Sequence, residues 1–147
     1  MWKQRVAFYS MGQRFTFTKQ EKLTGETVVT ELFLNGASFI AYPIRVVWTA
    51  SKKEDSPSLK VLMSVPKKKL KHAVDRNRVK RLLREAYRLH KNELTALVVE
   101  HGLQVRMALV WIPTEVLDYV KVDRKVLDAL SKMRKLLTLE NLEENRQ

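Results

Sequence analysis

The chain has 147 residues, of which 45% are hydrophobic, and this is enough to bury the core of one ordinary domain. Its formal net charge is +12 at pH 7 and it contains no cysteine, which excludes disulfides, thiol nucleophiles and thiolate metal sites. No apolar run approaches the roughly 20 residues that cross a bilayer, and the N-terminus lacks the apolar core of a signal peptide. We therefore expect a cytoplasmic protein that forms one domain over residues 1–147 and contacts no membrane.

The N-terminal part of the chain predicts an arm followed by a helix. Residues 1–14 show no period and are interpreted as a loosely ordered arm. Thr18 and Glu21 have the spacing of a helix capping box, and apolar residues recur at helical spacing within residues 26–34. Gly36 would then end this helix with a left-handed cap.

The next part predicts strands. Residues 39–50 are rich in β-branched and aromatic types and are interpreted as one strand, with Pro43 at an edge or bulge near its start. Residues 51–58 form a polar turn, and residues 59–65 are expected to be the hairpin partner. Alternation predicts a core face of Ile40, Tyr42, Ile44, Val46 and Trp48. The opposite face would hold Phe39, Ala41, Pro43, Arg45 and Val47.

The second half predicts two helices around a buried strand. Residues 72–99 form one long helix that Gly102 ends, and residues 103–112 resemble a central strand buried on both faces. An amphipathic helix lies between residues 120 and 139, and a polar tail follows it. The expected fold class is α+β, a two-layer sandwich of a mixed sheet with helices in the order αβββαβα and a core over residues 15–137.

Positive charge is concentrated in residues 60–91, which carry twelve Lys and Arg against Asp75 and Glu85. On a helical wheel, residues 76–90 have one apolar arc and one cationic arc. The apolar arc contains Val79, Leu82, Leu83, Ala86, Tyr87 and His90. The cationic arc contains Asn77, Arg78, Lys80, Arg81, Arg84 and Arg88, and only Glu85 interrupts it. Guanidinium groups bind phosphate in bidentate fashion and stack on bases, so this face predicts a nucleic-acid contact.

A catalytic side-chain set is not evident. The histidines at positions 72, 90 and 101 have no paired carboxylates at close spacing and are interpreted as helix-flank and turn residues. Glu140, Glu143 and Glu144 are interpreted as a solvated tail because no second ligand cluster accompanies them. These observations weigh against a protein that is itself a nuclease.

Residues 73–87, AVDRNRVKRLLREAY, closely resemble the arginine-rich RNR signature of the bacterial ribonuclease P protein component. The preceding SVPKKK at residues 64–69 is similar to the strand and lysine-bearing loop of that family, and residues 17–23 and 32–36 are similar to its N-terminal helix. The resemblance covers about residues 15–137. It implies a fold like the second domain of ribosomal protein S5, in which the RNR helix makes a left-handed crossover between parallel strands, against the common right-handed rule.

The resemblance implies an RNA-binding subunit of ribonuclease P, the endoribonuclease that removes the 5′ leader from precursor tRNA. In that family the RNA performs the hydrolysis with bound magnesium. We therefore expect no catalytic residue, metal site or cofactor on the protein alone, and no small-molecule substrate. The expected partners are the catalytic RNA and precursor tRNA. An alternative that uses the same charged face is a stand-alone RNA-binding or ribosome-associated module.

The resemblance and the wheel together assign two groups of site residues. The RNA-binding group is Lys67, Lys68, Lys69, Arg76, Asn77, Arg78, Lys80, Arg81, Arg84 and Arg88. The leader cleft would hold Val29, Phe33, Phe39, Arg45 and Val47, with Trp48 as the alternative if a bulge shifts the alternation. Two readings stay open for each of two residues: Asn77 as a helix-start hydrogen bonder or an RNA contact, and Phe33 as a core or a cleft residue.

Overall fold

The computed structural model describes residues 17–146, with side chains described for residues 17–140. The expected N-terminal arm, residues 1–14, lies outside this range. The chain begins with the 3-10 helix η1 (Lys19–Glu21) and continues through α2 (Glu26–Asn35), β1 (Ala37–Ala41), β2 (Ile44–Lys52) and β3 (Ser58–Ser64). It then forms α3 (Ala73–His90), α4 (Asn92–His101), β4 (Leu103–Trp111) and α5 (Tyr119–Arg146).

The four strands form one mixed sheet in the order β1-β2-β4-β3. β2 pairs antiparallel with both β1 and β4, and β3 pairs parallel with β4. The expected hairpin between residues 39–50 and 59–65 is therefore wrong, because β4 lies between β2 and β3. A parallel pair needs a crossover connection, and α3 and α4 supply it. The mixed α+β sheet is confirmed, and the handedness of the crossover stays a prediction.

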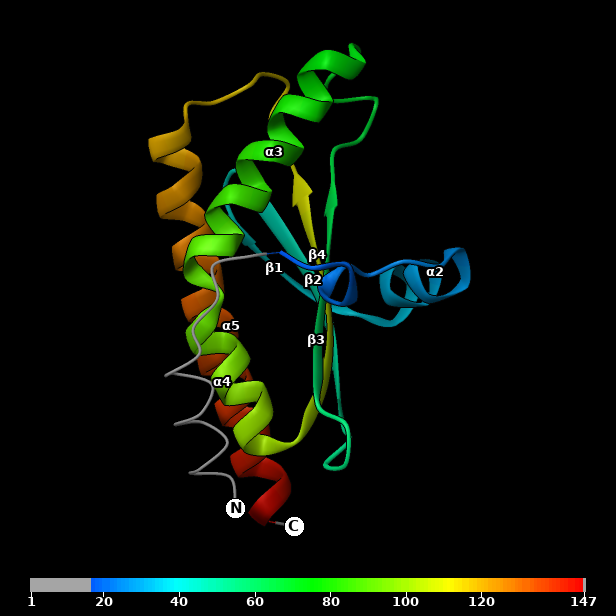
Figure 1. The fold of residues 1–147 in the computed structure, drawn as a ribbon, viewed down its shortest axis with the longest axis vertical. Helices are drawn as coiled ribbons and strands as arrows, with labels where there is room; N and C mark the ends of the chain where they lie inside the picture. The colour runs from blue at the N-terminus through cyan, green and yellow to red at the C-terminus, as the bar shows by residue number, and fades with distance from the viewer. Residues whose placement is uncertain (1–16, 147) are drawn as a thin grey trace.

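The helices lie on both faces of the sheet (Figure 1). Helices α3, α4 and α5 cover one face, and α2 lies on the other side. The main core forms between the sheet and the three helices, where Val46 and Met107 of the strands meet Leu83 of α3 and Met133 of α5. A smaller cluster lies under α2 and contains Leu23, Leu32, Val47 and Ala108. The predicted apolar face of α3 is confirmed by the burial of Val79, Leu83, Ala86 and Tyr87.

Residues 39–50 form two strands rather than one. A turn at Tyr42–Pro43, with a cis peptide bond, separates β1 from β2 and pairs Ala41 with Ile44. Cross-strand partners point to the same face of a sheet, so odd-numbered residues of β1 share a face with even-numbered residues of β2. Ile40 and Tyr42 are consequently 63% and 57% exposed, and their prediction as core residues is wrong. Ile44, Val46 and Trp48 are buried as predicted.

Helix boundaries differ from the expectations at three places. The long helix of residues 72–99 is two helices separated by Lys91, whose ammonium is buried and bonded to Glu21. The last helix continues to Arg146, past the expected end at residue 139. Gly36 is extended, with φ −74°, so its left-handed cap is wrong. Glycine is needed there for space, since a Cβ would lie 2.5 Å from the carbonyl oxygen of Leu32.

The central strand β4 is only partly buried on its second face. Ala108 packs under α2, whereas Gln104 and Arg106 on the same face are only half-buried. Val110 on this face is half-buried as well, so the expectation that β4 is buried on both faces is wrong for the α2 side, where Ala108 alone is buried.

Candidate nucleic-acid interface

Four side chains on the cationic face of α3 have no acidic partner among the described residues. Arg78, Arg81 and Arg84 are exposed, and Lys80 is half-buried. None of these four takes part in an ion pair among the described residues. Their positive charge is therefore available to an external polyanion, and their mutual repulsion is relieved only by such a partner.

Three arginines of the predicted RNA-binding group make hydrogen bonds within the protein. The Nε of Arg84 donates to the carbonyl oxygen of Lys80 at 3.3 Å. The Nη1 of Arg76 donates hydrogen bonds to the carbonyl oxygens of Leu70 and Lys71, at 2.9 and 2.7 Å. Arg88 donates to both carboxylate oxygens of Glu85, at 3.2 and 2.5 Å. This hydrogen bond lowers the pKa of Glu85 below its usual value. The charge of Arg88 is therefore compensated within the protein by Glu85.

The basic loop before α3 is held against the helix by backbone contacts. The amide groups of Lys69 and Leu70 donate to the carbonyl oxygen of Pro66, at 3.0 and 3.3 Å, which closes a tight turn. Leu70 is buried, and Arg76 binds its carbonyl oxygen. The three lysines at positions 67, 68 and 69 remain exposed. The structure thus brings these lysines beside the first turn of α3.

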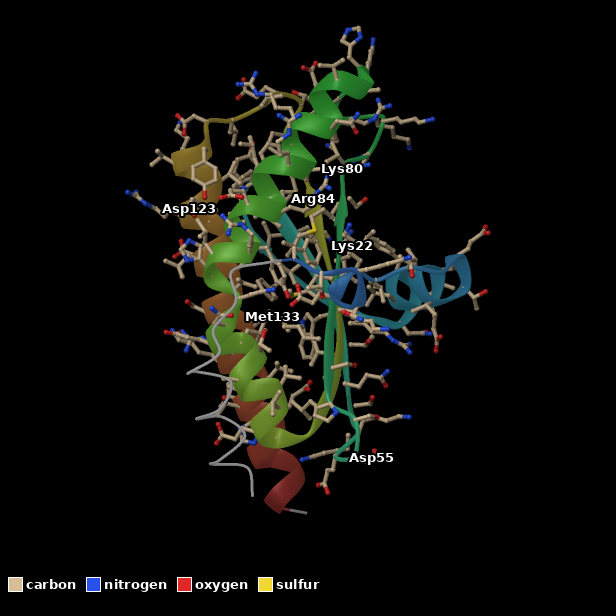
Figure 2. All side chains as sticks on the ribbon, in the orientation of Figure 1. Lys22, Asp55, Lys80, Arg84, Asp123 and Met133 are labelled. Carbon is tan, nitrogen blue, oxygen red and sulfur yellow. The ribbon has the colours of Figure 1, made fainter. Side chains whose placement is uncertain are left out.

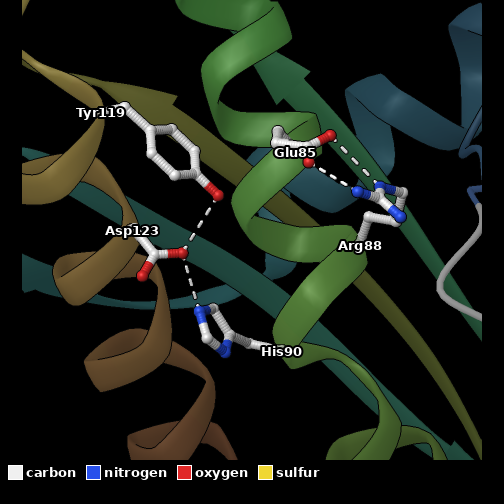
Figure 3. A network of polar contacts seen from close by, with 5 residues as sticks. All are labelled: Glu85, Arg88, His90, Tyr119 and Asp123. Atoms are coloured by element: carbon white, nitrogen blue, oxygen red, sulfur yellow. Dashed lines mark hydrogen bonds and ion pairs between the residues drawn. The ribbon is translucent and has the colours of Figure 1, made fainter.

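A polar network joins α3 to α5 (Figure 3). Nε2 of His90 lies 2.8 Å from Oδ1 of Asp123, and the hydroxyl of Tyr119 donates to the same oxygen at 3.3 Å. Burial, followed by the charge of Asp123, raises the pKa of Tyr119. His90 was interpreted only as a helix-flank residue, and the structure makes it a bridge between two helices. Together with the bond between Lys91 and Glu21, this contact positions the C-terminal end of α3.

Four of the five residues predicted for the leader cleft lie on the α2 side of the sheet. Val29 packs against the cluster that contains Val47, which is 1% exposed. Phe33 is 41% exposed and lies about 160° around the helix from Asn35, at 100° per residue. Because Asn35 faces the Thr49 side of the sheet, Phe33 faces the Arg45 side. The structure therefore brings Val29, Phe33, Arg45 and Val47 to one face and gives Phe33 the exposed position of a cleft residue.

Phe39 does not join this group. It pairs with Val46, and its ring packs on the opposite face of the sheet beneath α5, with Nζ of Lys132 at 4.8 Å from the ring centroid. The expectation that Phe39 shares a face with Arg45 is wrong because the turn at residues 42–43 changes the parity of the alternation. Trp48, the alternative, is also buried on the α5 side.

Two further cations near these surfaces were not identified from the sequence. Lys22 of the segment after η1, labelled in Figure 2, has its Nζ 5.9 Å from the ring centroid of Phe17. Arg106 lies on the α2 side of the sheet. Arg106 could have been identified from the sequence, because it is a charged residue within an otherwise apolar strand. Asn77 is exposed and makes no hydrogen bond with its side chain among the described residues, which favours its reading as a contact residue.

The described residues contain neither a metal-binding cluster nor a membrane-spanning helix. Over that range, no group of three His, Asp or Glu side chains is arranged to hold a metal ion. No helix of that part of the chain has the length and apolar character that crossing a bilayer requires. The charged face of α3 is consequently the dominant chemical feature of the described molecule.

Comparisons with known proteins agree with these features. A family model described as Ribonuclease P matches residues 17–134. The ribonuclease P protein component of Porphyromonas gingivalis is 35% identical over 116 residues, which cover 79% of this chain and 85% of that protein. The same component of Chlorobaculum tepidum is 44% identical over 82 residues, 53% of each chain.

Solved structures show the same fold at lower sequence identity. The RNase P protein from Thermotoga maritima has a TM-score of 0.58 and 22% identity, covering 76% of this chain and 96% of that one. A Staphylococcus aureus RNase P protein has a TM-score of 0.56 and 20% identity, covering 80% and 97%. The match of the family model to most of the chain, together with the extent of the relatives, shows that this chain belongs to the ribonuclease P protein family.

Proposed function

We propose that this chain is the protein subunit of ribonuclease P, which assists the catalytic RNA in removing the 5′ leader from precursor tRNA. The observation that carries the proposal is the face of α3 that holds Arg78, Lys80, Arg81 and Arg84, four cations with no acidic partner among the described residues. This face lies within the part of the chain that the family model matches. The family membership makes the ribonuclease P RNA its partner.

The chemistry of this face suits assembly with RNA rather than bond cleavage. Each basic side chain that binds a phosphate releases counterions from the RNA. This release contributes binding affinity that does not depend on the RNA sequence. The exposed lysines at positions 67–69 extend the same positive surface at the start of α3. Magnesium bound by the RNA would supply the hydrolytic chemistry in the holoenzyme, and the protein would neutralise phosphates that otherwise need more magnesium.

A second surface would hold the leader. Phe33 offers an exposed ring on which an unpaired base can stack, and Arg45 lies on the same face to contact a phosphate. Val29 of α2 packs against the cluster that contains Val47 and forms the apolar part of this surface. A leader on this surface would distinguish precursor from mature tRNA. We propose the cytoplasm as the compartment of the reaction.

The decisive assay measures cleavage of precursor tRNA by the catalytic RNA at low magnesium, with and without the protein. The wild-type protein should increase the rate, and the double variant Arg81→Glu, Arg84→Glu should lose most of that increase. Arg124→Glu changes the same kind of charge at an exposed position of α5 and serves as the control. If wild-type protein gave no increase in cleavage, the proposal would be wrong.

A stand-alone RNA-binding or ribosome-associated module is the competing outcome. Sequencing of the RNA that co-purifies with the protein distinguishes the two, since the proposal requires ribonuclease P RNA in the bound fraction. Recovery of ribosomal RNA without ribonuclease P RNA would favour the alternative.

A further inference from the structure

Residues 17–23, which include η1, are fixed to the rest of the fold at both ends of the segment. The ring of Phe17 packs edge-on against the buried ring of Tyr87 of α3, with the two centroids 5.5 Å apart. Leu23 is buried, and its amide donates a hydrogen bond to the carbonyl oxygen of Val61 at 3.0 Å. Val61 belongs to β3, an edge strand of the sheet. The segment is therefore held between α3 and the edge of the sheet.

A buried lysine holds the middle of this segment. Lys91 lies at the junction of α3 and α4, and its Nζ donates to both carboxylate oxygens of Glu21, at 2.6 and 2.7 Å. One of these oxygens also accepts a hydrogen bond from the amide of Thr18 at 3.1 Å. Separation of the pair would leave Lys91 with an uncompensated buried charge, so the ion pair fixes η1 at this junction. It also neutralises Glu21, the single acidic residue of residues 17–23.

Lys22 points to the side of the sheet that α3 covers. It forms a parallel bridge with Val61, whose side chain is buried in the main core between the sheet and the three helices. Residues directly opposite each other in a sheet share a face, and successive residues alternate. Leu23 accordingly lies in the cluster on the α2 side. The Nζ of Lys22 is 5.9 Å from the ring centroid of Phe17, which itself contacts Tyr87, so Lys22 lies beside α3.

This position adds one positive charge beside the cationic face of α3. Arg84 precedes Tyr87 by three residues, and residues at this spacing are neighbours on a helix surface. Lys22 is exposed and forms no ion pair among the described residues. Because Lys91 neutralises Glu21, no unpaired carboxylate of residues 17–23 repels a phosphate that approaches Lys22. An RNA backbone bound to Arg84 would therefore find a second cation on a neighbouring element.

We propose that Lys22 binds a phosphate of the same RNA as α3, and that the ion pair between Glu21 and Lys91 positions it. The inference rests on the proposed function, because ribonuclease P RNA is the partner in both. Glu21 and Lys91 are positioning residues: the pair fixes η1 against the junction of α3 and α4, and Lys91 is buried and therefore does not contact the RNA.

The first experiment measures the phosphate contact of Lys22. Ribonuclease P RNA is titrated with the full-length protein at several salt concentrations, for wild type, Lys22→Ala, Lys22→Arg and Lys135→Ala. Lys135 is an exposed lysine of α5 without an ion pair among the described residues, so its replacement is a matched control. Lys22→Ala should reduce the steepness of log affinity against log salt by about 0.7 to 0.9, the amount of one contact. Lys22→Arg and Lys135→Ala should keep the wild-type slope.

Glu21→Ala separates positioning from simple electrostatics, because the two effects have opposite signs. Removal of this carboxylate raises the formal net charge of +12 by one unit, which by itself would strengthen RNA binding. If Glu21 positions Lys22, Glu21→Ala should instead weaken binding and reduce the slope as much as Lys22→Ala does. The double variant Glu21→Ala, Lys22→Ala should bind like Lys22→Ala alone, because Glu21 acts through Lys22.

A second replacement of the ion pair keeps the test valid if Glu21→Ala unfolds at a lower urea concentration than wild type. Glu21→Leu combined with Lys91→Met substitutes an apolar contact of similar volume, which often preserves stability. With an unchanged urea midpoint, this double variant should bind the RNA with the wild-type slope, since the segment is again fixed and neither side chain touches the RNA.

The outcomes distinguish failure of this inference from failure of the proposed function. An unchanged slope for Lys22→Ala, or an equal change for Lys135→Ala, would overturn the phosphate contact. Tighter binding by Glu21→Ala, additive losses in its double variant with Lys22→Ala, or a reduced slope for the apolar pair at an unchanged urea midpoint would overturn the positioning role. The proposed function would stand in all these cases if wild-type protein increased cleavage of precursor tRNA. If wild-type protein neither bound ribonuclease P RNA nor increased cleavage, both proposals would fail.

Discussion

Arg81 and Arg88 test how α3 binds RNA, because both carry a guanidinium group but only that of Arg88 binds a carboxylate within the protein. Arg81 is exposed and forms no ion pair among the described residues. Arg88 is half-buried, and its guanidinium binds both oxygens of Glu85. A phosphate can bind Arg81 directly, whereas at Arg88 it must compete with a carboxylate.

The expected magnitudes follow from counterion release. Each phosphate contact contributes about 0.7 to 0.9 to the slope of log affinity against log salt. Arg81→Ala should therefore reduce the steepness of this slope by the amount of about one contact. The ratio of wild-type to variant affinity should consequently be about threefold smaller at 200 mM salt than at 50 mM salt. Arg88→Ala should change the slope by clearly less. Glu85→Gln releases Arg88, so it should steepen the slope and strengthen binding at low salt.

The assay is a titration of the catalytic RNA with each variant at several salt concentrations. Arg124→Ala on α5 controls for the change in net charge, since it removes an exposed arginine from another helix. Equal changes in slope for Arg81→Ala and Arg88→Ala would refute the reasoning, as would weaker binding by Glu85→Gln.

Three further predictions concern the leader surface, the packing of α2 and the network between α3 and α5. Phe33→Ala should weaken binding of precursor tRNA by the roughly 1–3 kcal/mol of one stacked base and leave mature tRNA unchanged; equal losses in the two binding assays would make Phe33 structural. Gly36→Ala places a Cβ 2.9 Å from Cγ1 of Val47 and 2.5 Å from the oxygen of Leu32, so urea unfolding should show a loss of about 1–3 kcal/mol from overpacking; an unchanged midpoint would contradict this. Burial raises the pKa of Tyr119 above its ordinary value of 10.0. The neutral phenol therefore contributes stability that is fully present below pH 10.0 and is lost as the pH rises through the raised pKa of the folded state. Tyr119→Phe should remove that alkaline dependence of the unfolding free energy, and identical pH profiles for the two proteins would count against it.

The surface of α3 could be predicted because its pattern is local. The burial of Val79, Leu83, Ala86 and Tyr87 follows from the 3.6-residue period, and the opposite arc of cations is exposed for the same reason. No such local pattern predicts which acidic side chain each basic side chain will contact. Arg88 and Glu85 are three residues apart and could be anticipated as a pair, but His90 meets Asp123 from a different helix.

The sheet was predicted less well, because its geometry depends on residues that are far apart in the chain. Phe39 was assigned to the wrong face, since one turn at residues 42–43 reverses which positions share a face. The insertion of β4 between β2 and β3 could not be read from strands that lie next to each other in sequence. The pocket lined by Asn35, Thr49 and Gln104 could not be predicted for the same reason, because these residues come from three separate elements.

The sequence by itself determined the amphipathic α3, the concentration of positive charge on it and the resemblance to the ribonuclease P protein, because all three are written in consecutive residues. Only the tertiary structure decided which side chains share a face of the sheet and which basic side chains form no ion pair among the described residues. These properties depend on strand order, register and helix packing, where a shift of one residue moves a side chain to the opposite face.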